Sequence, residues 1–200
     1  MKCSLKKVYN LLIIMAVSVI WISPAVHAEE RYSKFDIQVK VWAEELRSEV
    51  LAHFDQAIKS GKLTEAKIFD TFYIPIPNTY PQKYHTQYDR FTDENFQGLL
   101  DTYLSKSRRL LYFVIQDVNG YVPTHNSKYT QKLTGNKELD TKFNRAKAIY
   151  NDRTGLAASK NTESFLLQTY KRDTGETLYD LSIPIYIRDQ HWGCVRVGYN

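Results

Sequence analysis

The sequence predicts an α+β fold in which five antiparallel strands form one sheet and helices flank it. Apolar residues recur every three or four positions over residues 30–59, which indicates one long N-terminal helix. Two β-rich runs follow in the middle of the chain, and three more, separated by turn residues, fill its C-terminal end. Helical segments interrupt the strands once, after the second run, so strands and helices do not alternate as they do in a parallel sheet.

The first 28 residues have the pattern of a secretory signal peptide. Three lysines form a basic start, residues 11–22 are apolar, and small residues precede a cleavage site after Ala28. An uncleaved membrane anchor is the alternative, because the apolar stretch 8–28 approaches the ~20 residues that span a bilayer. Pro24 and the small residues favour cleavage. We therefore expect an exported protein, periplasmic or secreted.

Cleavage would leave 172 residues, a length that suits one domain with a single core. The removed segment holds three lysines and no acidic residue, so the formal net charge falls from +5 to +2. Nucleic-acid binding is not expected, since it requires a clustered basic surface. Cys194 is the one cysteine that remains, so no disulfide can form within the chain.

The predicted N-terminal helix has one apolar stripe. It consists of Phe35, Val39, Trp42, Leu46, Val50, Phe54 and Ile58. Gly61 ends the helix, and about 30 residues make it ~45 Å long, more than a small sheet requires. The stripe either packs against the sheet of its own chain or forms a homodimer through residues 30–59, and both remain open. We divide the mature chain into this helix (29–62) and a sheet-containing domain (63–200).

The next segment, residues 64–92, is irregular because three prolines interrupt it. Its many aromatic side chains either pack over the core as a lid or line a pocket. A helix is then predicted from Asp93, which suits an N-cap, through Leu104, and another within 136–151. Asn119-Gly120 is typical of a tight turn between two strands. The five strands are predicted near residues 110–117, 120–126, 163–172, 177–187 and 190–199.

The C-terminal half contains four motifs with a recognisable order: DRTG-x-AA-x-x-N from Asp152, FLLQTY-x-RDTGE, DLS-x-PIY and HWG-x-x-R-x-GY. These sequence motifs resemble those of the periplasmic sensing domain of bacterial methyl-accepting chemotaxis receptors, which is of the PAS-like Cache class. The resemblance is dense from Tyr112 to Tyr199 and thin before it. It implies a PAS/Cache-like sheet and a small-molecule pocket on one face, covered by the loops and helix between the second and third strands.

The resemblance also indicates candidate site residues. Arg153 would pair with a carboxylate on the ligand, and aromatic side chains would supply walls with hydrogen-bonding edges. The ligand-binding candidates are Tyr121, His125, Arg153, Tyr170, Asp180 and Trp192. Each has a structural alternative: Asp152 and Arg153 as braces of the loop, Trp192 as a core residue, and Asp180 as the partner of a backbone amide or an arginine.

The receptors that the chain resembles continue into a membrane helix and signalling coils, which do not follow here. We therefore expect an exported sensor that passes its signal to a separate membrane partner. The main alternative is a protein–protein interaction module that uses the same fold without a small ligand. A third is a non-covalent haem binder using His85 or His125; covalent haem requires C-x-x-C-H, which the chain lacks.

We expect neither an enzyme nor a metal protein. Cys194 and His191 are close in sequence, but a lone cysteine in a strand is usually a small core residue. The histidines lack metal-binding spacing, and no EF-hand pattern is present. No cofactor is expected.

Overall fold

The structure of the protein, a computed structural model, describes residues 32–171 and 176–200. Residues Lys34–Asn200 form one compact unit. The predicted signal peptide lies outside the described residues, as do residues 172–175, at the junction of the strands predicted near 163–172 and 177–187. Within the two described ranges, no helix combines the length and the apolar character needed to cross a bilayer.

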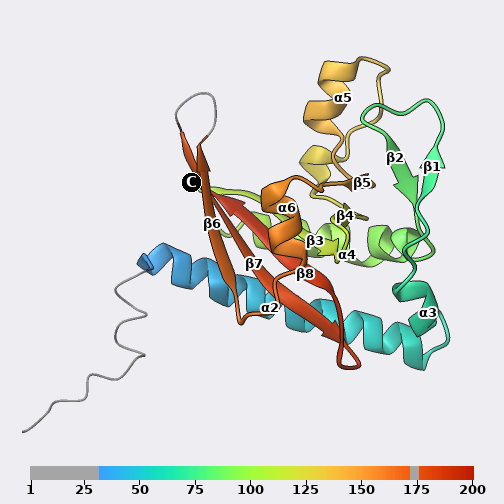
Figure 1. Ribbon diagram of the computed structural model, residues 1–200, viewed down its shortest axis with the longest axis horizontal. Helices are drawn as coiled ribbons and strands as arrows, with labels where there is room; N and C mark the ends of the chain where they lie inside the picture. The colour runs from blue at the N-terminus through green and yellow to red at the C-terminus, as the bar shows by residue number, and fades with distance from the viewer. Residues whose placement is uncertain (1–31, 172–175) are drawn as a thin grey trace, which may run out of the picture. The chain divides into compact units, whose positions relative to one another are not determined.

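One four-stranded antiparallel sheet organises the compact unit, with the strand order β3-β8-β7-β6 (Figure 1). Two further sheets have two strands each, β1 with β2 and β4 with β5. The elements are α2 (Lys34–Lys59), α3 (Glu65–Ile68), β1 (Ile74–Ile76), β2 (Lys83–His85), α4 (Asp89–Leu104), β3 (Leu110–Asp117), β4 (Tyr121–Val122), η1 (Ser127–Tyr129), α5 (Lys137–Phe143), β5 (Ala148–Ile149), α6 (Arg153–Ser159), β6 (Leu166–Lys171), β7 (Thr177–Ile187) and β8 (Gln190–Tyr199).

The three longest strands occupy their predicted ranges. β3, β7 and β8 begin and end where the apolar runs meet turn residues. Arg188 and Asp189 connect β7 to β8 with φ angles of 47° and 65°, the backbone of a tight hairpin turn. β6 is shorter than predicted and starts at Leu166.

The sheet has four strands and not the five that the sequence predicts. The turn at Asn119-Gly120 is present, with a hydrogen bond of 3.0 Å from Gly120 N to Asp117 O. The return strand, however, covers only Tyr121–Val122 and pairs with Ala148–Ile149 in a separate small sheet. A five-stranded PAS/Cache sheet is therefore not what the described residues form, although the class is α+β with a long N-terminal helix.

Two helices also differ from their predicted ranges. α4 starts at Asp89, one turn before Asp93, whose carboxylate instead accepts hydrogen bonds from Thr124 Oγ1 at 2.5 Å and Lys147 Nζ at 2.6 Å. The helix predicted within 136–151 ends at Phe143. Lys147 has a φ of 56° and its N–H donates to Val122 O at 2.7 Å. The segment that follows it, β5, therefore pairs with β4 and does not continue the helix.

The core lies between the sheet and the helices α2 and α4. α2 packs on β7 and β8, and Val39, Leu46, Val50 and Phe54 on its apolar stripe have no exposed surface. These stripe residues thus pack within their own chain. They therefore no longer support the predicted dimer through residues 30–59. Helix α6 packs on the same two strands, and its Gly155 and Ser159 accept hydrogen bonds from Gln116 on the other face. That second face carries the candidate site.

Candidate functional site

A cavity of about 230 Å³ lies on the sheet face opposite α2. Its floor is formed by Tyr112 and Val114 of β3 and Arg196 of β8. The alternation along each strand explains this floor, because Phe113, Ile115, Val195 and Val197 point into the α2 side of the core. The remaining walls come from Leu111 of β3, from Tyr170 of β6 and from the stretch that runs from β4 into α6. That stretch contributes Val122, His125, Tyr129, Arg145, Tyr150, Asp152 and Thr154.

Beneath the floor, Asp180 and Arg196 form a buried ion pair. Arg196 Nε lies 3.0 and 2.8 Å from the two Asp180 carboxylate oxygens, and the Tyr112 hydroxyl donates to the same carboxylate. Burial raises the pKa of Asp180, and the Arg196 guanidinium opposes this rise. Both charges are thus compensated within the protein, as buried ions require.

Hydrogen bonds that start at Arg196 also hold helix α6 in place on this face of the sheet. Arg196 Nη1 donates to Gln116 Oε1 at 3.1 Å, and Gln116 Nε2 donates to Ser159 Oγ at 2.7 Å and Gly155 O at 3.2 Å. The amide of Gln116 therefore links the β8 arginine to α6. Because these groups are all satisfied, the floor and α6 hold a fixed geometry without a ligand.

Arg145 is a cation of the cavity that has no acidic partner among the described residues. Its guanidinium carbon lies 5.8 Å from the Tyr129 ring centroid and 5.6 Å from that of Tyr150, and Nε is 3.5 Å from the Tyr150 hydroxyl. Among residues 32–171 and 176–200, no carboxylate lies within 4 Å of it. A guanidinium offers a planar fork of donors that matches carboxylate and phosphate oxygens.

His125 adds a neutral donor to the same cavity. Its Nδ1 accepts a hydrogen bond of 2.8 Å from the Asn126 N–H, so in the neutral ring Nε2 carries the proton. Burial lowers the pKa of His125 well below its ordinary value, and the nearby Arg145 and Lys128 lower it further. The Nε2–H group has no acceptor in the part of the chain that the structure describes. It is free to donate to a ligand.

The structure places three of the sequence-predicted residues at this face. His125 and Tyr170 line the cavity, and Asp180 lies beneath the floor as the partner of Arg196. Arg153 is the first residue of α6, between two cavity-lining neighbours, and its side chain is exposed.

The other two predicted residues lie in the core on the opposite side. Tyr121 donates its hydroxyl to Tyr84 O at 2.8 Å, while its neighbour Val122 lines the cavity. Trp192 donates from Nε1 to Ile68 O at 2.9 Å and packs on Phe54. The structural alternative that the sequence allowed for Trp192 is the one observed.

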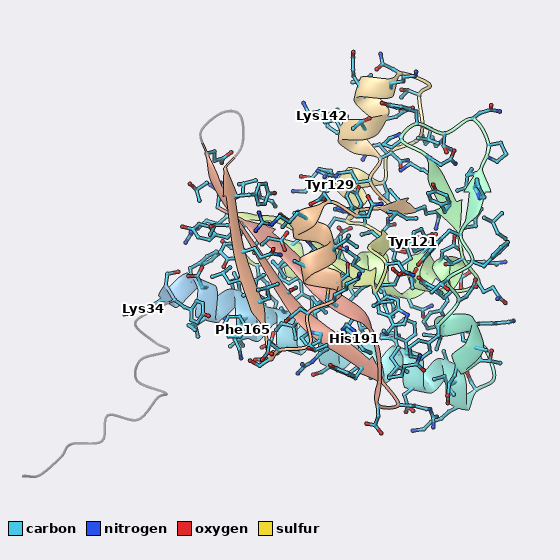
Figure 2. The ribbon with its side chains drawn as sticks, in the orientation of Figure 1. Lys34, Tyr121, Tyr129, Lys142, Phe165 and His191 are labelled. Atoms are coloured by element: carbon cyan, nitrogen blue, oxygen red, sulfur yellow. The ribbon has the colours of Figure 1, made fainter. Side chains whose placement is uncertain are left out.

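Sequence reasoning missed Arg145, Tyr112 and Arg196. Arg196 had a signal, because a charged residue between Val195 and Val197 interrupts an apolar strand and requires a buried partner. Arg145 had none, since the segment around it has helical spacing. Figure 2 labels Tyr129, whose ring contacts His125 at a centroid distance of 4.8 Å.

Within residues 32–171 and 176–200, no group of three or more His, Cys, Asp or Glu side chains could hold a metal ion. Burial raises the pKa of the Cys194 thiol, which disfavours the nucleophilic thiolate.

No protein-family model matches the chain, and no curated protein matches it. Among solved structures, the chain is similar to an extracellular ligand binding receptor from Desulfohalobium retbaense DSM5692, with 13% identity and a TM-score of 0.36. The likeness covers 84% of this chain and 26% of the receptor, so the chain spans about a quarter of the receptor's length. A likeness at this level identifies neither the fold class nor a ligand.

Proposed function

We propose that this chain is an exported sensing domain whose cavity binds a small ligand through a carboxylate or a similar oxyanion. The observation that carries the proposal is the Arg145 guanidinium, which lines a cavity and has no acidic partner among the described residues. The Nε2–H of His125 is a second donor in the same cavity. A cavity of about 230 Å³ has room for a small organic anion, since one water needs only ~10–15 Å³ by a comparable measure.

The aromatic walls suit a compact ligand with an apolar part. Tyr112, Tyr129 and Tyr150 line the cavity and supply aromatic rings for apolar contact. The hydroxyls of Tyr112 and Tyr150 already donate to Asp180 and to Arg145 O. Arg153 was the arginine that the sequence suggested. Because its side chain is exposed while Arg145 lines the cavity, we now expect Arg145 to bind the oxyanion.

A thermal-shift screen of small carboxylates and oxyanions tests the proposal. A ligand at a hundred times its dissociation constant stabilises by ~2.7 kcal/mol, roughly 5–10 °C for a domain of this size. We expect Arg145→Met to abolish the shift. Arg153→Met is the matched control, removing a nearby exposed guanidinium, and should retain it.

His125→Phe gives an independent measure, because it keeps an aromatic ring and removes the Nε2–H donor. A hydrogen bond to a charged group contributes ~1.5–3 kcal/mol, so affinity should fall about 10- to 100-fold. A shift lost in Arg153→Met and kept in Arg145→Met would contradict the assignment of Arg145. The absence of any shift across the library with wild-type protein would contradict carboxylate binding itself.

We also propose that the signal passes to a separate membrane partner, as the resemblance to chemotaxis-receptor sensing domains implies. Export is the part of this idea that is simplest to measure. N-terminal sequencing of the exported protein should begin at Glu29-Glu30-Arg31. Retention of Met1 in a membrane fraction would favour the anchor alternative.

A further inference from the structure

Positive charge is concentrated in one short part of the mature chain. Residues 127–147 contain six basic and two acidic residues, a net charge of +4, whereas residues 29–200 as a whole carry +2. One of the two acidic side chains is engaged locally: the Asp140 carboxylate accepts hydrogen bonds from Thr134 N at 2.8 Å and Gly135 N at 3.0 Å. The exposed charge of this region is therefore strongly positive.

The exposed lysines of this region are Lys128, Lys132, Lys137 and Lys142. In the described parts of the chain, none of their ammonium groups has a carboxylate within 4 Å. Three of them lie over aromatic rings instead: Lys128 over Tyr129, Lys137 over Tyr80 and Lys142 over Phe143, at 4.8, 4.9 and 5.1 Å from the ring centroids. The ammonium groups of these three lysines thus lie against the faces of aromatic rings in cation–π contacts.

Large exposed apolar side chains lie beside two of these lysines, Lys132 and Lys142. Leu139 is 45% exposed and Phe143 is 38% exposed. Together with Lys132 they line an open cavity of about 190 Å³. We call Lys128, Lys132, Lys137, Leu139, Lys142 and Phe143 the α5 surface. Helix α5 packs mainly against η1 and stands away from the main sheet (Figure 1), with Lys142 at its side (Figure 2).

We propose that the α5 surface docks on an anionic phospholipid bilayer. Exposed leucine and phenylalanine with lysines beside them form the composition that inserts at the boundary between headgroups and acyl chains. Lysine is a point charge without the fixed fork of arginine, and so suits a diffuse anionic surface better than one defined carboxylate. Lys132, Leu139 and Phe143 do not line the cavity with Arg145, whereas Lys128 lies over Tyr129 of its wall.

Co-sedimentation with vesicles tests the proposal. We expect wild-type protein to sediment with phosphatidylcholine vesicles that contain phosphatidylglycerol, to remain in solution with phosphatidylcholine alone, and to dissociate at high salt. Each lysine near an anionic bilayer contributes about fivefold to binding. Lys132→Glu/Lys142→Glu should therefore weaken binding at least ~25-fold, and Leu139→Ser/Phe143→Ser should weaken it without changing the net charge.

The matched control is Lys34→Glu/Lys59→Glu, which changes the net charge equally but lies on α2, against the opposite sheet face (Figure 2). It should bind vesicles like wild type, and circular dichroism should show all variants folded. Equal loss in the control, equal binding to phosphatidylcholine alone, or no sedimentation at all would each overturn the proposal. Tighter binding to polyglutamate than to anionic vesicles would replace the bilayer by an acidic protein partner.

Discussion

At the residue scale, the stability of the sheet face opposite α2 depends on the buried ion pair between Asp180 and Arg196. Asp180 has no exposed surface and Arg196 has 9%. Two charges in such a place are stable only because each satisfies the other, with Tyr112 and Gln116 completing the hydrogen bonds.

Removing one partner should therefore cost more than removing both. Arg196→Met leaves the Asp180 carboxylate buried without its counter-ion, and we expect a loss of ~3–5 kcal/mol in the free energy of unfolding. The double variant Arg196→Met/Asp180→Leu should recover much of this loss. Urea unfolding of the two variants measures it, and a double variant less stable than Arg196→Met would contradict the pairing.

His125 should make stability depend on pH in the mildly acidic range. The pKa of the folded-state imidazole is below its ordinary 6.5 because of burial, so the unfolded chain binds the proton first as pH falls. The contribution of this residue is fully present above pH 6.5 and is lost as pH falls below it, by up to ~1.4 kcal/mol per pH unit.

The comparison with His125→Gln isolates this contribution. Between pH 7.5 and 5, the unfolding free energy of wild type should fall more steeply than that of the variant. Parallel pH profiles for the two proteins would show that His125 takes up a proton in the folded state as readily as in the unfolded chain.

At the element scale, the sequence predicts strands better than it predicts the connection that carries Arg145. β3, β7 and β8 are continuous apolar or alternating runs bounded by turn residues, so local pattern and tertiary structure agree. Segment 144–149 has helical spacing, yet Lys83 Nζ donates to the carbonyl oxygens of Asn144 and Ala146 at 2.9 and 2.8 Å. Hydrogen bonds from residues about 60 positions away overrode the local periodicity, and no single-sequence pattern encodes them.

The same limit applies to the candidate site. Tyr170 could be predicted because it lies in β6, one of the predicted strands of the sheet. His125 was predicted on a return strand of that sheet, but it lines the cavity from the segment that follows β4. Trp192 could not be assigned to one face, since a register shift between Ile185 and Tyr186 of β7 disturbs the alternation beside it. Arg145 lines the cavity because its segment is not helical, which the sequence pattern did not predict.

Gly198 of β8 should be indispensable for the cavity floor. It is the register partner of Tyr112 on β3, and a Cβ atom at this position would lie 2.1 Å from the Tyr112 ring. Gly198→Ala must therefore displace the ring and weaken its hydrogen bond to Asp180. We expect a loss of ~1–3 kcal/mol, as for overpacking in a core, together with weaker ligand binding.

Tyr112→Phe is the control for this substitution, because it keeps the ring in place and removes only the hydroxyl. Thermal melting and the ligand-induced shift should distinguish the two variants, with the larger loss of ligand binding in Gly198→Ala. Wild-type melting of Gly198→Ala would show that the ring moves at no cost.

At the scale of the whole molecule, α2 cannot be separated from the domain that it covers. Its buried residues pack on β7 and β8 in the same compact unit. A chain that starts near Leu63 would expose this face of the sheet, and we expect it to aggregate. Loss of a dimer on truncation would therefore not identify α2 as the interface.

A dimer through residues 30–59, if it forms, must use the apolar side chains that α2 leaves outside the core. Ile37 and Val41 lie one helical turn apart and are 39% and 40% exposed. Ile37→Glu/Val41→Glu should convert the dimer to a monomer in analytical ultracentrifugation and leave thermal melting nearly unchanged, since neither side chain belongs to the core. Surface substitutions of this kind usually change stability by less than ~0.5 kcal/mol. If the double variant still forms a dimer, the dimer uses another surface. If the wild-type protein is a monomer at tens of micromolar, α2 packs only within its own chain.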